Sequence, residues 1–534
     1  MDDEAFQRTV AKLAKIREKS DIKIRPTPHL KPMFTTLAGT EKEFKLRYYQ
    51  VQMVLHLMSM HRFVCGDDTG LGKTVETVAA LCYLWDRNPD LKAIVLTKKS
   101  ALEQWVEEGF ETFTTGVTII LSSGTPKQRK AAYEKYVAST GPTVLISGYR
   151  SMVRDFETIQ DWQPGVLVLD EATVVKNPTA QVSQVIRHLS SQSKRCWGLT
   201  ATLIKNNLVE GFGIYRVVVP GLFTHSKSAF EADYCVIQMQ PIGRGRKVPV
   251  VVGVRKRDVI RFREKISPYY LGRPKHEVAS ELPPLTSRTI RMGMSHAQHI
   301  KYQEALSGIL EHGDGEDREV TPLTAITYCQ EIVNHPDLID IEGDSEKLDR
   351  LGDILTDGGD FTGEKVIIFT RFEKMVTIAV DYLDKKGVKC VRITGKENIA
   401  QRRAAQKAFQ DVDSDVKVAW ITMAGGDAIN LQAAKCMIFY DTPFSAGDYL
   451  QILGRMIRIG SIHDRVYAIH LVCRDTVDER VMEIMSKKME LLEAVLGKRL
   501  KGEDDDEDYE IASQGDVSAL FEALQNDAFK VLGA

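Results

Sequence analysis

The residues of this sequence that are best suited to bind a phosphate group lie between positions 65 and 74. The stretch reads CGDDTGLGKT and nearly satisfies the pattern G-x-x-x-x-G-K-[ST] of a phosphate-binding loop, but Asp67 stands where the pattern has its first glycine. The glycines at positions 70 and 72 would let the backbone approach phosphate oxygens closely. The stretch therefore predicts a nucleotide site with one residue that the pattern does not explain.

The last two residues of the stretch, Lys73 and Thr74, would complete the site if the loop joins a buried strand to a helix. The apolar segment MHRFVC (60–65) precedes the loop, and VETVAALCYLW (75–85) follows it with the apolar spacing of a helix. In that setting Lys73 would reach the β- and γ-phosphates and Thr74 would hold Mg²⁺. A glycine-rich turn with a chance Gly-Lys-Thr is the alternative that this stretch alone leaves open.

Two adjacent carboxylates, Asp170 and Glu171, follow the apolar run VLVL farther along the chain. A P-loop ATPase needs a metal ligand and a residue that orients or deprotonates water directly after a buried strand. Two acids at a strand end usually form a solvated turn, but their position behind a phosphate loop favours the catalytic interpretation. We expect Asp170 to be the metal ligand and Glu171 to act on the water.

Two arginines late in the chain, Arg455 and Arg458, are spaced to share one helical face in YLQILGRMIRIG (449–460). Guanidinium groups that reach across a cleft stabilise the charge on a phosphoryl group during transfer. Such an arginine finger is typically worth about 10³ to 10⁵ in rate. Ordinary surface arginines are the alternative, and the segment alone does not decide between the two.

Strands and helices must position these residues, and the hydrophobic pattern predicts two sets of buried parallel strands. Short apolar runs alternate with helix-length segments, which is typical of α/β domains with helices on both faces of a parallel sheet. Between roughly 215 and 345 the pattern is lost. The first set of strands is 92–97, 117–122, 143–148, 165–170 and 196–202, and the second is 365–370, 389–394, 416–423, 436–441 and 466–472.

Composition indicates a globular protein that works inside the cell. The chain has 534 residues, of which 43% are hydrophobic and 27% charged, enough for two or three domains. No apolar run approaches the roughly 20 residues needed to span a bilayer. The eight cysteines include no C-x-x-C pair, so we expect neither zinc nor a disulfide framework. The net charge is −2, but residues 503–534 carry −9, which leaves +7 on residues 1–502.

Taken together, these motifs resemble the Swi/Snf-type DNA translocases of helicase superfamily two, over about residues 46–496. The resemblance implies a fold of two tandem RecA-like lobes with a family-type insertion between them. Its strength lies in the order of the motifs, which are LRYYQ (46–50), GDDTGLGKT (66–74), IVLTKKSALEQWVEE (94–108), LISGYRSM (145–152), DEATVVKNP (170–178), LTATLIKNNLVE (199–210), KVIIFTRF (365–372), AGGDAINLQAA (424–434) and QILGRMIRIGS (451–461).

The resemblance also implies site residues and ligands. ATP and Mg²⁺ are the implied cofactors, and DNA bound through its phosphates is the implied partner. An acid regularly occupies the position of Asp67 in this family. Carried over by motif, the catalytic residues are Lys73, Asp170, Glu171, Arg455 and Arg458; the ATP contacts are Gln50 (adenine), Asp68, Thr69, Gly70, Leu71, Gly72, Lys73, Thr74 and Gln451; the metal ligands are Thr74 and Asp170; and the residues that couple hydrolysis to the nucleic acid are Thr200, Thr202, Gly426 and Asn430.

Some positions depart from the family pattern, and one basic segment invites a hypothesis. Thr173 replaces a histidine, Thr-Ala-Thr replaces Thr-Gly-Thr, and Ser461 ends a signature that normally ends in glutamine. Residues 242–265 hold nine basic and two acidic residues and suggest an exposed hairpin. A solvated hairpin is the simpler interpretation, but we expect DNA contacts from Arg244, Arg246 and Lys247.

The expected domains are an N-terminal extension (1–45), an ATP-binding lobe (46–214), a helical and basic insertion (215–345), a second lobe (346–498) and an acidic tail with a short helix (499–534). A compact prokaryotic or viral translocase in the cytoplasm or nucleoid is the first hypothesis, acting on duplex or branched DNA. A strand-separating DNA or RNA helicase and a nucleic-acid-binding scaffold are the alternatives. The tail is a candidate site for a protein partner, and we expect no membrane partner.

Overall fold

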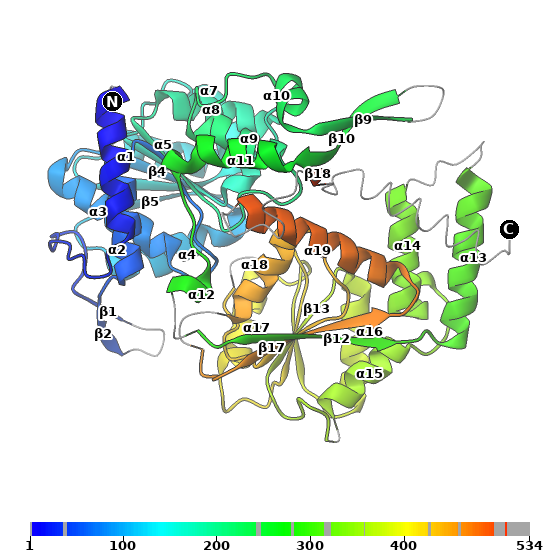
Figure 1. Cartoon of the computed structure of the whole chain (residues 1–534). Helices are drawn as coiled ribbons and strands as arrows, with labels where there is room; N and C mark the ends of the chain where they lie inside the picture. Colours follow the sequence, from blue (N-terminus) through cyan, green and yellow to red (C-terminus); the bar gives the residue numbers. More distant parts are fainter. Residues whose placement is uncertain are drawn as a thin grey trace.

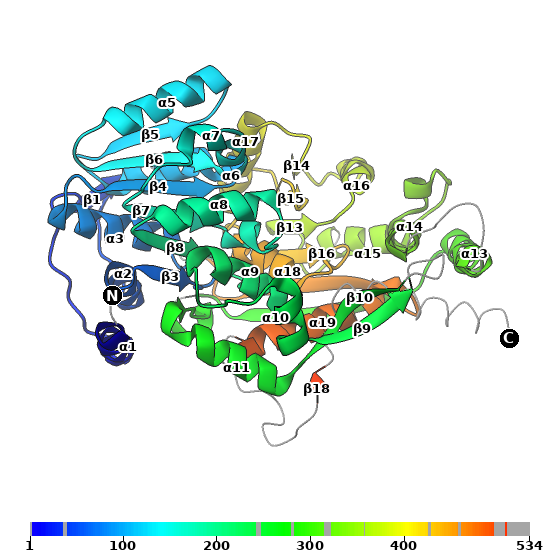
Figure 2. The ribbon, with the colours of Figure 1, turned by 90° about the horizontal axis from the view of Figure 1, so that it is seen from above.

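The computed structural model describes residues 3–35, 40–241, 247–278, 282–313, 322–356, 358–425, 429–457, 461–495 and 508–509. Figure 1 shows two lobes stacked one above the other, and Figure 2 shows the same ribbon from above. One lobe is built on a sheet of seven strands and the other on a sheet of six. Among the described residues, no helix has the length and apolar content to cross a bilayer.

The sheet of the first lobe is parallel throughout and contains every strand expected for it. Its strand order is β11-β3-β8-β7-β4-β6-β5. The strands are nearly continuous apolar runs because both faces of the sheet are covered. Their bounds are β3 (Arg62–Cys65), β4 (Lys92–Thr97), β5 (Thr118–Ser122), β6 (Thr143–Gly148), β7 (Val166–Asp170), β8 (Arg195–Leu199) and β11 (Tyr270–Leu271).

Helices cover both faces of this sheet and create two hydrophobic clusters. One cluster joins α5, α6, α8 and α9 to one face, and the other joins α1, α2 and α3 to the opposite face. The two faces of β7 illustrate the division, since Leu167 belongs to the first cluster and Val168 to the second. The helices are α1 (Asp3–Arg17), α2 (Tyr48–Ser59), α3 (Lys73–Arg87), α4 (Leu102–Gln104), α5 (Pro126–Ala138), α6 (Tyr149–Arg154), α7 (Phe156–Ile159), α8 (Gln181–Gln192) and α9 (Leu208–Val218).

The second lobe repeats this plan with the strand order β12-β17-β16-β13-β15-β14, again parallel throughout. Its two faces are covered by separate clusters of buried side chains. The strands are β12 (Leu285–Met292), β13 (Val366–Phe369), β14 (Cys390–Ile393), β15 (Val418–Ile421), β16 (Cys436–Phe439) and β17 (Val466–Cys473), and the helices are α15 (Glu346–Leu355), α16 (Glu373–Lys385), α17 (Ile399–Gln410), α18 (Ala446–Met456) and α19 (Val477–Val495).

The segment between the lobes contributes to both sheets. It supplies β11 to the edge of the first sheet and β12 to the edge of the second, inside the range 215–345 that we expected to be insertion and linker. The expected domain boundaries stay predictions. The structure adds that β11 belongs to the sheet of the first lobe and β12 to the sheet of the second. Its other elements are α10 (Lys227–Tyr234), β9 (Val236–Pro241), β10 (Lys247–Arg255), α11 (Lys256–Ile266), α12 (Lys275–Val278), α13 (His296–Gly313) and α14 (Pro322–Asn334).

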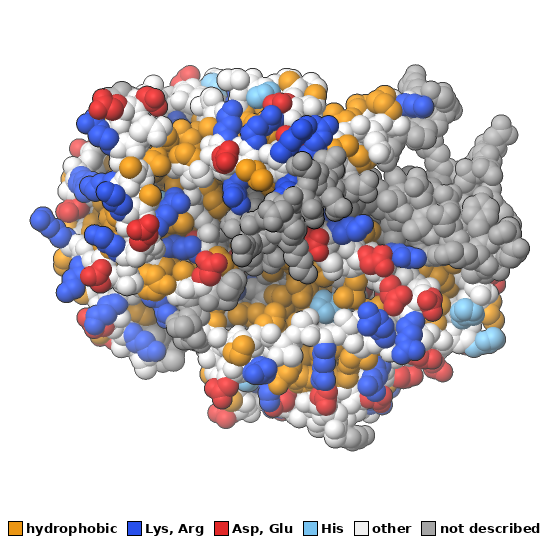
Figure 3. Space-filling view, in the orientation of Figure 1, with side chains coloured by type: hydrophobic (Ala, Val, Ile, Leu, Met, Phe, Trp, Pro, Cys, Tyr) orange, Lys and Arg blue, Asp and Glu red, His pale blue; other side chains and the backbone are white. Residues whose placement is uncertain are grey.

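The basic segment 242–265 is only partly the hairpin that its sequence suggested. β9 and β10 pair antiparallel, but the chain turns helical at Lys256. The interpretation of 256–265 as hairpin is wrong because Val259, Phe262 and Ile266 recur at helical spacing and are all buried. Lys and Arg side chains gather over α11 in the space-filling view (Figure 3).

The helix α19 links the two lobes. It begins after the last strand of the second lobe, and its residue Leu491 is buried in a core cluster of the first. Lys488 Nζ donates to Asn206 Oδ1 (3.2 Å) and to Phe444 O (3.1 Å), one acceptor from each lobe. Of the predicted tail, the structure describes only β18 (Asp508–Tyr509), which pairs with β10, and the short helix predicted after it lies outside the described residues.

Candidate active site

The phosphate loop connects β3 to α3, as the sequence predicted. Gly70 and Gly72 have φ values of 91° and 98°, a left-handed conformation that a side chain would strain. Gly72 caps α3, so the loop ends at the amino terminus of a helix of 15 residues. The backbone N–H groups at such a helix start form a ready site for a phosphate.

The side chain of Lys73 contacts the backbone of its own loop. Its Nζ donates to the carbonyl oxygens of Asp67 (2.6 Å) and Asp68 (3.2 Å). Thr74, the next residue, lies beside the π-helical turn Trp105–Glu111, since a Cβ added at Gly109 would stand 3.3 Å from Thr74 Cγ2. The lysine therefore starts from contacts with two carbonyls that the oxygens of a bound phosphate would replace.

Gln50, expected to contact adenine, contacts the loop itself. Its Nε2 donates to Leu71 O (2.9 Å), and its Oε1 accepts from the backbone N–H of Arg47 (3.0 Å). Tyr49 donates its hydroxyl to the same Leu71 carbonyl (3.2 Å). The two side chains at the start of α2 thus contact the middle of the phosphate loop, and the adenine contact of Gln50 stays a prediction.

Asp170 ends β7, and two side chains that the sequence reasoning missed hold its carboxylate. Thr97 Oγ1 donates to Oδ2 (2.6 Å), and Trp105 Nε1 donates to the same oxygen (2.8 Å). Burial raises the pKa of Asp170 and the charge of Glu171 raises it further, whereas these two hydrogen bonds and the charge of Lys73 lower it. The donors therefore orient the carboxylate and favour its ionised form, the form that a metal ligand requires.

Glu171 adopts a strained backbone conformation at the same place. Its φ is 51°, and the described residues include only two other non-glycine residues with positive φ. A bulky residue in the left-handed region costs free energy, and such strain is concentrated at functional sites. Tyr149 supports the turn because its hydroxyl donates to Asp170 O (2.7 Å). The chain therefore leaves regular strand geometry at Glu171, directly after Asp170 ends β7.

The residues expected to couple hydrolysis to nucleic acid lie where the lobes meet. Thr200 and Thr202 are buried and bound to each other, with Thr200 Oγ1 donating to Thr202 O (2.8 Å). A Cβ added at Gly447 of α18 would stand 2.8 Å from Thr202 Cγ2. Lys205 and Asp448 form an ion pair across this contact (2.6 Å). The Thr-Ala-Thr segment therefore packs directly against the second lobe.

The arginine-bearing helix α18 faces the phosphate loop. A Cβ at Gly454 would stand 2.8 Å from the Cβ of Thr69, so the side chain of Thr69 packs directly against the backbone of Gly454. The next residue, Arg455, is buried, and Gln451 lies one turn earlier on the same helix and is half-buried. The predicted site residues that lie outside the described part of the chain are Arg244, Arg246, Gly426 and Arg458.

A cavity of about 740 Å³ lies between the lobes beside this site. Residues 100–108 of the first lobe and residues 399–432 of the second supply its walls, among them the predicted coupling residue Asn430. Arg403 of α17 crosses it to Glu103 (2.8 Å) and Glu107 (3.5 Å). The remaining predicted DNA contact, Lys247, is exposed at the start of β10 and does not line this cavity.

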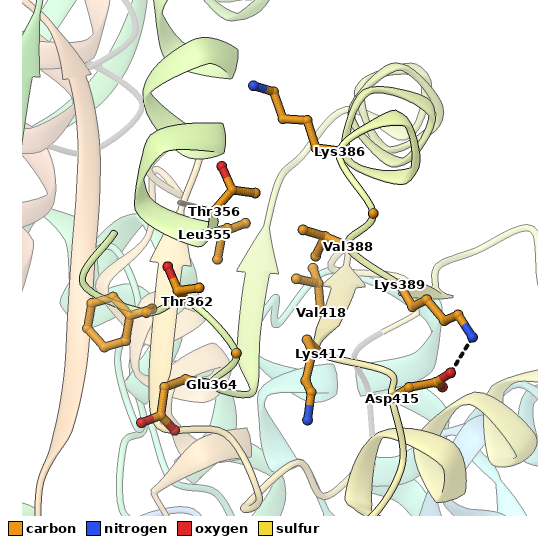
Figure 4. Close-up of a pocket in the computed structure, with 13 residues that line it drawn as sticks. Leu355, Thr356, Thr362, Glu364, Lys386, Val388, Lys389, Asp415, Lys417 and Val418 are labelled. Carbon is orange, nitrogen blue, oxygen red and sulfur yellow. Dashed lines mark hydrogen bonds and ion pairs between the residues drawn. The ribbon is translucent and has the colours of Figure 1, made fainter. Parts of the chain in front are cut away.

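A smaller cavity of about 250 Å³ lies within the second lobe alone. Lys386, Lys389 and Lys417 line it, and Lys389 pairs with Asp415 (Figure 4). These residues stand where β14 and β15 begin, whereas Asp170 and the phosphate loop stand where strands of the first lobe end. Ligands of parallel sheets bind at the carboxyl ends of the strands, so this cavity is not part of the candidate site.

Two known protein domains match this chain. Residues 49–338 match the SNF2-related domain, and residues 346–460 match the helicase conserved C-terminal domain. The first match alone covers more than half of the sequence. The chain belongs to the SNF2-related family. The prediction of a Swi/Snf-type member of helicase superfamily two is thus confirmed, together with the α/β fold of two parallel-sheet lobes.

Two relatives within the SNF2-related family illustrate the similarity. Chromodomain-helicase-DNA-binding protein 1-like of Mus musculus is 30% identical over 473 residues, which cover 85% of this chain and 50% of the relative. Nuclear protein STH1/NPS1 of Saccharomyces cerevisiae is 26% identical over 477 residues, covering 85% of this chain and 35% of the relative. The chain spans half or less of the length of these curated relatives.

Among solved structures, the Sulfolobus solfataricus SWI2/SNF2 ATPase core in complex with dsDNA is similar to this chain. The identity is 21%, the TM-score is 0.40, and the match covers 91% of this chain and 97% of the other. The Sulfolobus solfataricus SWI2/SNF2 ATPase core domain matches at 21% identity with a TM-score of 0.37, over 86% of this chain and 91% of the other.

Proposed function

We propose that this chain is an ATP-dependent translocase on duplex DNA, which hydrolyses ATP between its two lobes and remodels protein–DNA complexes or branched DNA. The observation that carries the proposal is the convergence of three elements at one place. The phosphate loop, the Asp170–Glu171 pair and the Arg455 end of α18 come from different parts of the chain and meet at the contact between the lobes. Such a site changes when the lobes move relative to each other.

The residues present fit ATP with Mg²⁺. A threonine hydroxyl and a carboxylate, from Thr74 and Asp170, are the hard oxygen ligands that Mg²⁺ prefers. When bound, Mg²⁺ neutralises charge on the β- and γ-phosphates. Lys73 would leave its carbonyl contacts to bind the same phosphates, and Glu171 would orient the attacking water. Arg455, together with Arg458, would stabilise charge on the transferred group from the other lobe.

DNA is the proposed partner, bound through its phosphates. A motor that moves along a duplex cannot depend on base contacts, so its affinity should fall steeply with salt. The 740 Å³ cavity supports this assignment because residues of both lobes line it, including Arg402, Arg403 and the predicted coupling residue Asn430. The relatives named for DNA binding support it as well. In this assignment Thr200, Thr202, Gly426 and Asn430 couple hydrolysis to movement.

ATP turnover with different nucleic acids tests the proposal. We expect strong stimulation by duplex DNA, weak stimulation by single-stranded DNA or RNA, and loss of turnover in Lys73→Ala. Displacement of a triplex-forming strand without separation of the duplex would support translocation. Strand release from forked DNA would favour the helicase alternative. Equal turnover with and without every nucleic acid would refute both motor functions, and nucleic-acid binding without turnover would indicate a scaffold.

The hairpin and the tail have proposed roles outside the ATP site. We assign DNA contact to Arg244, Arg246 and Lys247, which reversal of the three charges tests through duplex affinity and duplex-stimulated turnover. Unchanged values would refute the role. The acidic tail is proposed to restrain DNA binding, and removal of residues 501–534 should then raise basal duplex affinity. The alternative role of the tail is to hold a protein partner.

A further inference from the structure

The chain segment 270–275, which follows α11 and leads to the second lobe, lies directly against the phosphate loop. β11 pairs in parallel with β3. Two hydrogen bonds continue this pairing into the loop. Gly66 N–H donates to Leu271 O (2.7 Å), and Asp68 N–H donates to Arg273 O (3.1 Å). The first residues of the phosphate loop therefore form a strand pair with a segment about 200 residues away in the sequence.

The side chain of Arg273 lies behind the loop and binds Asp67. Its Nε donates to Asp67 Oδ1 (3.0 Å), its backbone N–H donates to the same oxygen (3.1 Å), and its Nη2 contacts Oδ2. Its Nη1 donates to Tyr49 O (2.6 Å) and Gln52 Oε1 (3.1 Å). Asp67 is fully buried and only 8% of Arg273 is exposed. These contacts of the guanidinium are therefore made inside the protein.

Glu76 and Cys65 complete this buried group. Glu76 Oε1 lies 3.7 Å from Arg273 Nη2, and the Cys65 thiol lies 3.8 Å from Glu76 Oε2. Burial and the charge of Asp67 raise the pKa of Glu76, which favours its uncharged form. Cys65, Asp67 and Glu76 are close enough to share a metal ion, but Arg273 already supplies a positive charge at that place.

The other end of the segment contacts the second lobe. The backbone N–H of Lys275 donates to Asp68 Oδ2 (2.9 Å), and its Nζ donates to Ile457 O (2.6 Å). Ile457 directly follows α18 and directly precedes Arg458. Lys275 also begins α12, which Figure 1 shows beside the place where the lobes face each other. One short segment thus touches the phosphate loop and the arginine-bearing end of α18.

We propose that residues 270–275 form a brace that keeps the phosphate loop in its anion-binding shape through Arg273 and links its position to the end of α18 through Lys275. Arg273 is a positioning residue, because its guanidinium binds Asp67, Tyr49 and Gln52 behind the loop. The brace rests on the proposed ATP site. In this proposal, the segment that leads into the second lobe holds the geometry of the ATP site from outside the phosphate loop.

Arg273→Lys tests the loop end of the brace. A lysine keeps the charge but cannot bind both oxygens of Asp67 in a fork. We expect a fluorescent ATP analogue to bind about 10-fold more weakly, within the roughly 100-fold that a 1 Å misplacement can cost. The KM for ATP should rise more than kcat falls. Lys275→Met, at the other end, should leave analogue affinity within about 2-fold and lower the duplex-stimulated kcat about 10-fold.

Arg129→Lys is the matched control. Arg129 makes a fork of the same geometry with Asp155, with its Nε 2.7 Å from Oδ2 and its Nη2 2.8 Å from Oδ1, and Asp155 is partly exposed. The helix of Arg129, α5, packs beside β5, at the opposite end of the sheet from the β3 strand that leads into the phosphate loop. Both Arg→Lys variants should unfold at lower temperature than the wild type. Only Arg273→Lys should lose affinity for the analogue. Equal affinities in the two variants would reduce Arg273 to a structural role and overturn the proposal.

Two further measurements apply if Arg273→Lys does not fold. The double variant Asp67→Asn with Arg273→Met removes both charges of the Asp67–Arg273 pair together, and it should still bind the analogue weakly. In the wild type, the analogue should slow amide hydrogen exchange in residues 271–275 together with the loop. Protection confined to the loop would overturn the brace. A wild type that binds the analogue but does not hydrolyse ATP would refute the proposed function. The affinity and exchange measurements would still test the brace in that case.

Discussion

The hydrogen bond from Trp105 to Asp170 gives a quantitative prediction about the metal ligand. Trp105→Phe removes the indole donor, which lies 2.8 Å from Oδ2, and keeps an aromatic ring at a site that is 2% exposed. A hydrogen bond to a charged group is worth about 1.5–3 kcal/mol. If the whole amount is lost in the transition state, kcat/KM for ATP falls about 10- to 150-fold.

The pH and Mg²⁺ dependence of turnover distinguish this effect from lost packing. The pKa of Asp170 is raised by burial and by Glu171 and is lowered by the bonds from Thr97 and Trp105. Removal of one donor therefore raises this pKa further. Because only the ionised carboxylate binds Mg²⁺ well, the acid limb of the pH–rate profile should move to higher pH. The Mg²⁺ concentration for half-maximal turnover should rise, most clearly below neutral pH.

Trp85→Phe is the control for the loss of a buried indole donor. Trp85 is fully buried in the same lobe and donates to Leu91 O (2.7 Å), away from Asp170. It should lose stability without a change in Mg²⁺ dependence. Thr97→Val, which removes the second donor to Oδ2, should shift the acid limb in the same direction as Trp105→Phe. If Trp105→Phe and Trp85→Phe give the same acid limb and the same Mg²⁺ requirement, the proposed role of Trp105 is refuted.

Three further predictions concern the contacts around the loop and between the lobes. Gly66→Ala would place a Cβ 2.2 Å from the hydroxyl of Tyr270, so we expect the free energy of unfolding to fall by about 1–3 kcal/mol, with recovery by Tyr270→Val in urea titrations. The raised pKa of Glu76 means that the folded chain keeps a proton that the unfolded chain releases above about pH 4.5. Wild-type stability should therefore fall relative to Glu76→Gln by up to about 1.4 kcal/mol per pH unit above that value, and parallel pH curves would contradict this. Lys205→Met and Asp448→Asn should each lower duplex-stimulated kcat, with a coupling of about 1 kcal/mol in the double variant, whereas additive effects would show that the 2.6 Å pair does not act in turnover.

The elements that the sequence predicted well are those whose signal is local. The buried strands could be predicted because parallel strands covered on both faces are continuous apolar runs, such as Val166–Asp170. The phosphate loop could be predicted because its glycines, lysine and threonine are adjacent. The interpretation of residues 256–265 as part of a hairpin is wrong because it follows from their charge. The spacing of Val259, Phe262 and Ile266 indicates a helix.

The contacts that the sequence did not reveal depend on which strands are neighbours. Thr97 and Trp105 reach Asp170 from 73 and 65 residues away, because β4 lies next to β7 in the sheet. Neither strand order nor register can be read from one sequence. Arg273 is 206 residues from Asp67, and the strand that brings it there, β11, has two residues. So short a strand carries no periodic pattern.

Asp67 shows how a phosphate loop can dispense with its first glycine. Asp67 is absent from the residues with positive φ, so the backbone at this position does not require a glycine. The close approach occurs one residue earlier, where Gly66 makes room for the ring of Tyr270. The carboxylate of Asp67 is then available to form the ion pair with Arg273. A loop whose shape depends only on glycines can be remodelled locally, but one anchored by a buried ion pair to the chain that enters the second lobe cannot shift alone. The residue that departs from the general pattern is thus the one through which the shape of the loop depends on the rest of the molecule.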